Sequence, residues 1–598
     1  MDKKNTLIGI LLLIAAIAVM RYGQQVAPPQ PAPEITRPTG ENQAPGPAQS
    51  TLPESSPANA AFAALAETNT DASIVTLAND YITARFTNYG GALRDVALKN
   101  YNRTAETPEP YIFNQVHTAP MLALNSLAAL GHRTRYELAS TTDTEVVYRT
   151  VFENRVEITR RYRIVPGAGA ADGKNDPYRI HHETTLRNLT DHTTTLPLTL
   201  NLGTTALISA TDVGLYLNVA TYDGDSTHVI ERGDLEGGGL LNWLGLRNNP
   251  PKSELARPGA TTWAAVKNQF FTSIYTPSQP GAGIAVRRVE LPPIDGNHRA
   301  NTGLTATMTL DPVTLAPAAE TTHTGDLYVG PKEYARLSRF EQRQDKVMQY
   351  DRYFFNRIFF SGYIAPLMYT IMNWMHGFVG NWGLAIILMT LLLKTITLPF
   401  TLAASRSAKR MQKIQPEMQA LRAKYKDNPQ KMQRETMDLF KKHRVNPMGG
   451  CLPIFITMPL FIAFFIMLQG TAELRYQPFL WTGDLSAPDT IARLFGLPLN
   501  IMPLLMGATM LIQMRLVPSP TVDNAQMKMM KFMPVIFTLI CYNFSCALAL
   551  YSTINGLFTI AQQLIVNRLK DPAAPATPAP RTDLTGRPII NVTPKKKN

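Results

Sequence analysis

One run of membrane length, interrupted by a single lysine, most constrains what this chain can fold into. The run covers residues 381–400 and reads NWGLAIILMTLLLKTITLPF, with Lys394 as its only charge. About 20 apolar residues let a helix cross a bilayer. A cation in the middle of such a helix costs about 2.5–3.5 kcal/mol to insert, so it usually faces water or a partner and carries function. Lys394 is therefore the first candidate functional residue.

A second interpretation of Lys394 stays open. The lysine lies about six residues before the end of the run, and a lysine near a helix end can extend its side chain until the ammonium reaches the lipid headgroups. In that case Lys394 anchors the helix and takes no part in binding.

The other charges also follow a membrane pattern. The chain of 598 residues carries a formal net charge of +13, and its basic residues gather beside the apolar runs. Residues 406–444 alone contain twelve Lys and Arg against four Asp and Glu. Cytoplasmic loops of membrane proteins carry such an excess. Topology therefore explains the charge, and a nucleic-acid-binding protein is disfavoured.

The segment 71–350 predicts a separate, strand-rich domain. Val156, Ile158 and Tyr162 alternate with polar residues, as in a strand with one buried face. Similar short runs recur at 81–87, 178–186 and 196–202. Short strands separated by turn residues favour an antiparallel sandwich.

The only arrangement in this domain that resembles metal ligands is the sequence His181, His182 and Glu183. Adjacent strand residues point to opposite faces, so we predict no metal site. The chain has no recognisable phosphate loop or nucleophile signature, and sugar binding on a face of the sandwich is the enzymatic alternative. The domain cannot depend on disulfides, because the cysteines all lie in the membrane half, at Cys451, Cys541 and Cys546.

The amino terminus predicts a signal anchor over residues 1–23. Lys3 and Lys4 precede a short apolar run and place the terminus in the cytoplasm. Ala16-Ile17-Ala18 resembles a cleavage site but lies inside the run, so retention is favoured over cleavage. Residues 24–70 are rich in Pro and Ala and predict a disordered linker.

Five more spans are predicted after the strand-rich domain. Residues 351–380 precede them and predict an amphipathic helix in the membrane interface, because charges interrupt its aromatic sequence. The spans are 381–400, 449–470, 494–516 and two within 532–567, with a turn at Asn543, Ser545 and Cys546. The final run exceeds the roughly 20 residues of one crossing, which favours a hairpin. With the anchor, the chain has six predicted spans and both termini in the cytoplasm.

The basic loop, residues 402–446, predicts a hairpin of two helices broken near 427–429. An apolar stripe on the first helix consists of Met411, Ile414, Met418 and Leu421. Such a stripe usually packs against a neighbour. Methionine also adapts to varied apolar partners, so substrate contact is the alternative. The tail, 568–598, ends in three consecutive lysines that fix topology or contact anionic lipid or ribosomal RNA.

Seven segments have counterparts in one family. The membrane half contains NWGLAIILMTLLLKTITLP, SAKRMQKIQPEMQALRAKY, VNPMGGCLPIFITMPLFIAFF, LRYQPFLWTGDLSAPD and KFMPVIFT, and the soluble domain contains TTWAAVKNQFF and GDLYVGPKEYARL. With the amino-terminal anchor, these segments resemble the Gram-negative form of the YidC/Oxa/Alb family of membrane protein insertases. The set is highly specific and follows the family's order.

The resemblance implies an architecture and an activity. The expected architecture is a multi-pass α-helical membrane protein with six transmembrane helices, of which five (381–567) form the insertase core around a hydrophilic groove, and an all-β supersandwich domain in the periplasm. The expected activity is insertion, folding and assembly of inner-membrane proteins, without an enzymatic step or a cofactor. Expected partners are nascent membrane proteins, the Sec translocon and its accessory subunits, the ribosome through the basic tail, and lipids. The chain is expected to be a monomer.

Two departures from the family matter for the groove. The family usually has an arginine where this chain has Lys394, which keeps the charge but loses the planar donor fork. In the last hairpin, Tyr551 is followed by Ser552 rather than a second aromatic residue. We expect Lys394 to attract acidic or polar parts of a substrate. Further groove polarity is expected from Thr390, Gln513, Tyr551, Asn555 and Gln562, with ordinary interhelical hydrogen bonds as the alternative.

Two other functional classes remain open. An ion or solute transporter would also carry an intramembrane lysine, but the sequence has no visible repeat of paired broken helices. A membrane-tethered carbohydrate enzyme is suggested by the sandwich alone, and catalysis by the soluble domain would support it.

Overall fold

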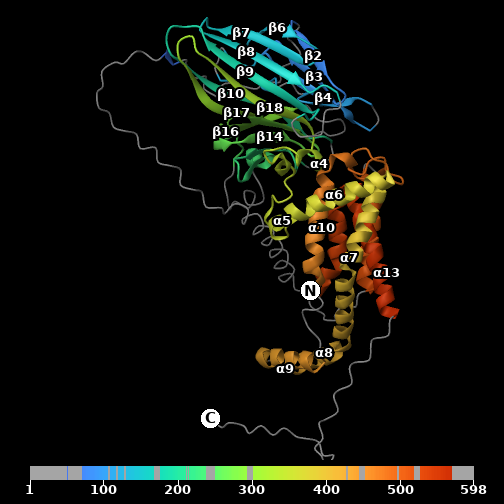
Figure 1. Cartoon of the computed structure of the whole chain (residues 1–598). Helices are drawn as coiled ribbons and strands as arrows, with labels where there is room; N and C mark the ends of the chain where they lie inside the picture. The colour runs from blue at the N-terminus through green and yellow to red at the C-terminus, as the bar shows by residue number, and fades with distance from the viewer. Residues whose placement is uncertain are drawn as a thin grey trace, which may run out of the picture.

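The computed structural model contains a β domain stacked on a helical part (Figure 1). It describes residues 50–51, 71–105, 108–115, 119–126, 130–167, 175–209, 212, 214–237, 250–291, 301–425, 428–443, 452–494, 497–516 and 525–568. The predicted anchor and most of the basic tail lie outside the described residues. Of the predicted linker, only Ser50–Thr51 is described, as strand β1, which pairs in parallel with Thr194 and Thr195.

The β domain is a sandwich of antiparallel strands, as predicted. Strand β8 (Val156–Ile164) alternates buried with more exposed residues along its length, and Ile158 and Tyr162 are fully buried. The next strand, β9 (Arg179–Asn188), repeats this pattern and separates His182, in the core, from half-buried His181 on the other face. One-sided burial of a strand drives the sheets together because each sheet must cover its apolar face.

Three sheets make up the domain, and their order shows how distant segments meet. The largest sheet runs β12 (Thr227–Glu231), β11 (Asn218–Tyr222), β14 (Trp263–Lys267), β15 (Phe271–Pro277), β18 (Glu320–Pro331), β9, β8, β7 (Glu145–Phe152) and β6 (Glu137–Thr141). A second runs β1, β10 (Thr194–Ala206), β17 (Asn301–Leu315), β16 (Gly281–Leu291) and β13 (Glu254–Thr261). The third runs β2 (Ile74–Ala78), β3 (Ile82–Thr87), β4 (Ala92–Asn102) and β5 (Pro110–Phe113). A short helix, α2 (Arg232–Glu236), follows β12.

The β domain is joined to the helical part by hydrogen bonds as well as by the chain. The guanidinium of Arg475 donates to the carbonyl oxygens of Asn102, at 2.5 Å, and Arg103, at 2.8 Å. The Tyr216 hydroxyl donates to Gln469 Oε1 at 2.9 Å. These contacts fix the sandwich on one end of the helical part, where α4 (Tyr334–Leu337) and the 3₁₀ helix η2 (Gln344–Met348) lead into it.

The segment 351–380, predicted as a helix in the membrane interface, forms α5 (Phe354–Ile358) and α6 (Ser361–Val379). One face of α6 is buried against the protein, including Met368 and Met372, whereas Tyr363 and Phe378 are more than four-fifths exposed. Large apolar side chains on one face of a helix mark a surface that meets lipid or a partner.

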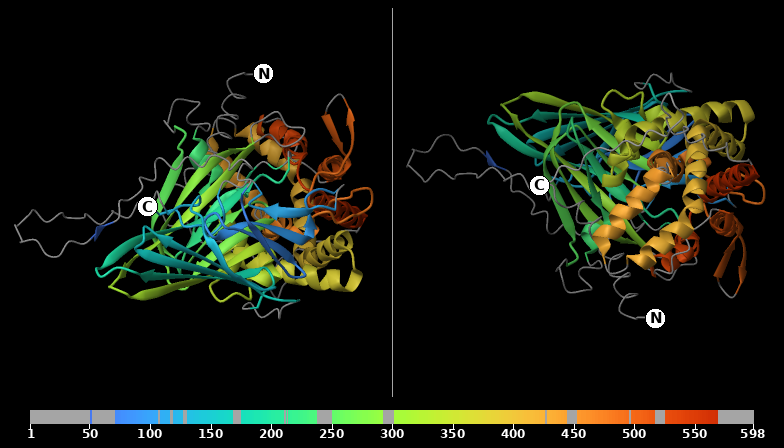
Figure 2. Two further views of the ribbon diagram at one scale, coloured as in Figure 1. Left: turned by 90° about the horizontal axis from the view of Figure 1, so that it is seen from above. Right: turned by 90° about the horizontal axis from the view of Figure 1, so that it is seen from below.

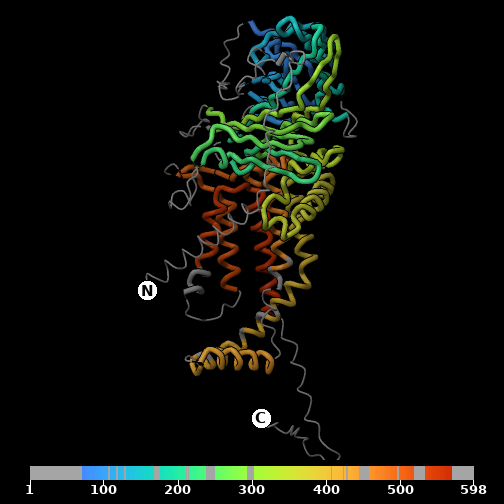
Figure 3. Tube along the Cα trace, turned by 90° about the vertical axis from the view of Figure 1, so that its left-hand side faces the viewer, coloured from blue at the N-terminus to red at the C-terminus, as the bar shows by residue number. Residues whose placement is uncertain are grey.

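The following helix, α7 (Trp382–Lys413), runs 13 residues beyond its predicted end at Phe400. The added sequence is rich in Ala, Lys and Arg, which are strong helix formers, and extending a helix is far easier than starting one. The predicted hairpin therefore begins later, with α8 (Gln415–Lys424) and α9 (Pro429–Lys442) lying across the far end of the bundle from the β domain (Figure 3).

The remaining helices pack in an open arc. They are α10 (Leu452–Gly470), α11 (Ile501–Leu516), α12 (Ala525–Ile540) and α13 (Cys546–Arg568). α10 contacts α7 and, less extensively, α13; α7 contacts α13, α13 contacts α11 and α11 contacts α12, but the described residues of α10 and α12 make no extended contact. The region 532–567, predicted as a hairpin, contains parts of two helices, α12 and α13. Both of them contact α11. A two-stranded sheet of β19 (Thr490–Leu494) and β20 (Leu497–Asn500), joined to α10 by η4 (Ala472–Leu474), projects from the bundle (Figure 2).

Among the described helices, one passes a length and composition test for crossing a membrane: residues 382–411 of α7. Residues 457–470 and 501–516 form shorter apolar helices. The six-span count therefore remains a prediction.

Candidate functional site

Lys394 reaches across the interface between α7 and α13. Its ammonium donates to Thr559 Oγ1 at 2.8 Å and lies 5.9 Å from the centre of the Phe558 ring. Its side chain is half-buried. No carboxylate among the described residues pairs with it, so a hydroxyl is the only hydrogen-bonding partner that the described part of the chain gives this cation.

Further polar contacts follow the same interface toward α8. The Thr401 hydroxyl donates to Gln562 Oε1 at 3.2 Å, and Lys409 Nζ lies 3.5 Å from the carbonyl oxygen of Val566. Together with Lys394, these residues form a line of polar groups between α7 and α13, which we call the α7–α13 seam. Gln562, one of the predicted groove residues, lies on the seam and is buried.

The other predicted groove residues are placed differently. Thr390 is fully buried, and its hydroxyl donates to the Ile386 carbonyl of its own helix at 2.7 Å. Tyr551 is buried in an edge-to-face contact with Phe464, with ring centres 4.7 Å apart. Asn555 accepts the Thr559 hydroxyl at its backbone carbonyl. The structure therefore brings Lys394 and Gln562 to one seam but gives Thr390 and Tyr551 packing environments.

Gln513 lies where α11 and α13 approach closely. A Cβ atom added to Gly556 would come within 2.6 Å of Thr509 Oγ1 and 2.7 Å of Gln513 Nε2. Small residues allow two membrane helices to approach in this way. Gly556 thus lets α11 hold α13 in position beside α7.

Sequence reasoning missed Thr559, the partner of Lys394. Its position was available, because Tyr551, Asn555, Thr559 and Gln562 are spaced four, four and three residues apart, which places them on one side of a helix. Thr401 gave no comparable signal.

The predicted apolar stripe of the hairpin is largely a packing surface. Ile414 and Met418 are buried, and Leu439 of α9 is buried as well. Met411 and Leu421 are half-buried. The packing interpretation therefore describes the two central residues, and the outer two retain exposed apolar surface.

No group of three or more metal-ligating side chains occurs within the described ranges. His181 and His182 face opposite sides of β9, as their adjacency predicts.

Two family models match the chain in succession. The model described as the YidC periplasmic domain matches residues 74–361, and that of the 60Kd inner membrane protein matches residues 374–573. They correspond to the β domain and the helical part.

Several relatives are named membrane protein insertase YidC. The one from Syntrophobacter fumaroxidans is 38% identical over 340 residues, which cover 56% of this chain and 58% of that protein. The one from Saccharophagus degradans is 30% identical over 512 residues, covering 83% of this chain and 84% of that protein. The first of these alignments, and that with the Pelobacter propionicus relative at 48%, span only about half the length of the relatives.

Solved structures give a weaker likeness. A crystal structure of an active YidC insertase with its first transmembrane domain resolved has a TM-score of 0.31 and 15% identity, over 82% of this chain and 91% of that one. A galactose mutarotase related enzyme from Lactobacillus acidophilus has a TM-score of 0.29 and 9% identity, over 43% of this chain and 97% of that one. The family models and the long alignment with the Saccharophagus relative establish that this chain belongs to the YidC family of inner-membrane protein insertases.

Proposed function

We propose that this chain inserts, folds and helps to assemble integral inner-membrane proteins, through a positively charged groove that involves Lys394. The observation that carries the proposal is the environment of Lys394: a half-buried ammonium between α7 and α13 with one hydroxyl partner at 2.8 Å. An ammonium has three N–H donors. Two donors remain for water or a guest, since no second hydrogen bond to the described residues is made.

Charge attraction gives this arrangement a mechanism. Moving an acidic tail through hydrocarbon costs several kcal/mol per charge, whereas a fixed cation in a wet groove offsets part of that cost. The substrate's acidic or polar segment would pair transiently with Lys394 while its apolar span partitions into lipid. No covalent step is involved, so the activity is insertion and not enzymatic catalysis.

The open arc of helices supports a lateral exit to lipid. Because the described residues of α10 and α12 make no extended contact, an apolar span can leave between them without unpacking the seam. The large exposed side chains of α12, including Leu539 and Ile540, suit contact with lipid. The topology in this proposal has six spans, cytoplasmic termini and a periplasmic β domain.

The hairpin of α8 and α9 is proposed to receive substrates before the groove does. Met411 and Leu421, together with exposed Met437 of α9, offer adaptable apolar contacts. Deleting residues 410–441 should reduce both insertion and crosslinking of the substrate to the rest of the chain. Undiminished insertion by the deleted chain would remove this role.

The partners of the proposed function are nascent membrane proteins, with the Sec translocon and its accessory subunits for some of them. The ribosome is a further proposed partner, through the basic tail. The chain is proposed to act as a monomer.

The decisive experiment is insertion of a single-span test protein with an acidic tail into liposomes that contain only this chain. We expect Lys394→Arg to retain insertion and Lys394→Ala to lower its rate about tenfold, since a hydrogen bond to a charged group contributes about 1.5–3 kcal/mol. Lys394→Glu should be slower still because it repels the tail. Arg515→Ala, which removes an exposed cation at the end of α11, is the matched control and should insert normally.

Two results would contradict the proposal in different ways. Equal rates for all four residues at position 394 would make Lys394 an anchor and leave the insertase function without this mechanism. No insertion by the wild-type chain would favour a chaperone that depends on the Sec translocon.

A further inference from the structure

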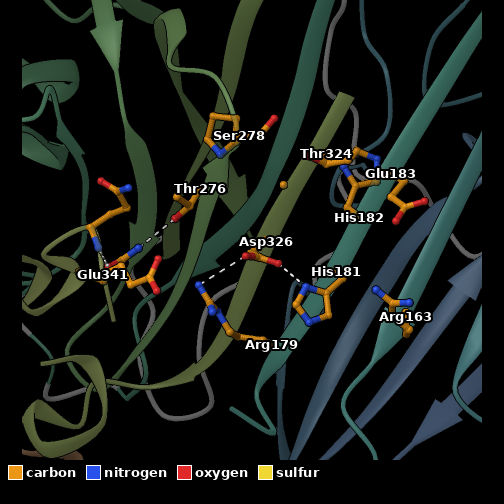
Figure 4. A pocket seen from close by; sticks show the side chains of 14 residues that line it. Arg163, Arg179, His181, His182, Glu183, Thr276, Ser278, Thr324, Asp326 and Glu341 are labelled. Carbon is orange, nitrogen blue, oxygen red and sulfur yellow. Dashed lines mark hydrogen bonds and ion pairs between the residues drawn. The ribbon is translucent and has the colours of Figure 1, made fainter. Parts of the chain in front are cut away.

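A polar cavity of about 330 Å³ lies in the β domain, in a different region from the α7–α13 seam (Figure 4). Strands β8, β9, β15 and β18 form its floor, and the segment 341–344 closes one side. A volume near 300 Å³ lies at the lower end of the range for small-molecule sites. Most such sites are mainly apolar, whereas this one is lined chiefly by charged and hydroxyl-bearing side chains, so a ligand here must be recognised by hydrogen bonds.

The strand register explains why these side chains meet. Asp326 pairs with Thr276 on one side and with His181 on the other, and His181 pairs with Arg163. Directly paired residues project to the same face of a sheet. The four therefore form a row across four strands, although they come from positions up to 163 residues apart, and Figure 4 shows their side chains around the cavity.

Charges in the cavity are largely compensated. Asp326 hydrogen-bonds to His181 Nδ1, and its other oxygen lies 3.5 Å from Arg179 Nη2. Burial raises the pKa of Asp326, but the His181 hydrogen bond and the Arg179 charge outweigh it and hold that pKa below its usual range. Asp326 is therefore ionised and already neutralised. Arg163, Glu183 and Glu341 also line the cavity, so basic and acidic side chains are nearly balanced and the lining offers no strong net charge to attract a simple ion.

The cavity also lacks an open aromatic face. Arg179 lies over the Phe340 ring at 4.7 Å from its centre, and no aromatic ring other than histidine is among the lining residues. Stacking and apolar burial are therefore minor here. Paired carboxylates and guanidinium groups, with hydroxyls from Thr276 and Ser278, match a neutral ligand that presents several adjacent hydroxyl groups, because each hydroxyl both donates and accepts.

We propose that this cavity is a binding site for a neutral saccharide, held by hydrogen bonds to Arg163, His181 and Asp326. The site is independent of the insertion mechanism, since none of its residues belongs to the helical part. Binding requires no reaction at the sugar.

The segment 341–344, which closes one side of the cavity, connects it to the helical part. Gln344 Nε2 donates to Thr276 Oγ1 at 3.3 Å, and the Trp263 indole donates to the Gln342 carbonyl at 2.8 Å. These bonds hold the segment that leads into α5. A saccharide that bridges β18 and this segment would strengthen the attachment, so amide hydrogen exchange in residues 338–350 should slow when the site is filled.

The test uses the full chain in lipid nanodiscs and titrates three neutral disaccharides, maltose, trehalose and chitobiose, by ligand-observed NMR and calorimetry. A zwitterionic dipeptide and inorganic phosphate are the competing probes. We expect at least one disaccharide to bind saturably and Arg163→Gln to weaken it about tenfold. Ser278→Trp, at the exposed rim, should block binding by filling the cavity.

Arg187→Gln is the matched control, because Arg187 is an exposed arginine on the same face of β9 outside the cavity. It should bind the disaccharide as the wild type does. Both arginines are exposed, so neither substitution should disturb folding. Failure of all three disaccharides to saturate, tighter binding of the dipeptide or phosphate, or equal loss in the Arg187→Gln variant would overturn the proposal.

Discussion

The β domain and the helical part each hold a basic side chain inside the structure, but the two side chains differ in their hydrogen-bond partners. In the β domain, Arg160 is fully buried and its guanidinium donates to the carbonyl oxygens of Gly90, at 3.1 Å, and Leu122. In the helical part, half-buried Lys394 has one hydroxyl partner. A charge surrounded by fixed acceptors is a structural element. A charge with unused donors is available to bind.

The surroundings of Arg160 reinforce the contrast. His182 lies 3.1 Å from its Nη2, and burial together with the Arg160 charge lowers the pKa of His182 well below its usual value. The ring is therefore neutral and adds no second buried charge. Lys267 of the same domain is also fully buried and donates to the Val347 carbonyl at 2.9 Å. These two buried basic groups of the β domain thus donate to backbone carbonyl groups, although Arg160 Nε has no partner among the described residues.

The largest effect should come from removing the cation of the β domain. Arg160→Met leaves two buried carbonyl groups without their donor, and each unsatisfied buried acceptor costs about 1–3 kcal/mol. Lys394→Met should change the free energy of unfolding by less than about 1 kcal/mol, because only one hydroxyl loses its partner. Pulse proteolysis in urea, with fragments assigned to each region, measures both. Similar destabilisation by the two variants would contradict the view that Arg160 is structural and that Lys394 is available to bind.

Of these two basic residues, the sequence singled out Lys394 but not Arg160. Lys394 stood out because it is the only charge in an apolar run of membrane length. Arg160 was hidden, although the strand period places it on the buried face beside Ile158 and Tyr162. Its acceptors come from loops 70 and 38 residues away, and only the tertiary structure brings them together.

The same limit applies elsewhere in the molecule. The sandwich, a helix within 351–380 and the helices of the hairpin followed from local sequence patterns, and the structure contains them. Sugar binding on a face of the sandwich was an alternative from the sequence, but the residues that line the cavity could not be predicted, because Asp326 lies 145 residues from its partner His181. The predicted end of α7 at Phe400 was wrong, because the start of the charged sequence continues this helix to Lys413 instead of beginning the hairpin.

A second prediction concerns what holds Lys394 beside its partner. In Gly556→Ala, the new Cβ meets Thr509 and Gln513 at under 3 Å, and overpacking of this kind costs about 1–3 kcal/mol. Displacing α13 should also slow insertion, since Thr559 moves with it. Gly377→Ala on α6 is the control, because nothing lies within 4 Å of its Cβ. It should leave stability unchanged or raise it slightly, and a loss equal to that of Gly556→Ala would contradict the packing argument.

The smallest expected effect concerns a buried acid, Glu473, which lies between the β domain and the helical part. Glu473, in η4, accepts the hydroxyl of Tyr369 from α6, and its Oε2 has no partner among the described residues. Burial, reinforced by the nearby Glu333 charge, raises the pKa of Glu473 to about 8. The folded protein therefore holds a proton that the unfolded chain releases near pH 4.5. The stability that this group contributes is greatest below pH 4.5, falls as the pH rises to about 8, and then levels off. We expect this loss to be of the order of 1–3 kcal/mol, measured as urea unfolding at pH 5 and pH 9. Glu473→Gln keeps the acceptor for Tyr369 without the charge and should remove this dependence of stability on pH. An unchanged pH profile in this variant would show that Glu473 is ionised without cost. The region around Glu473, unlike the core around Arg160, would then admit water.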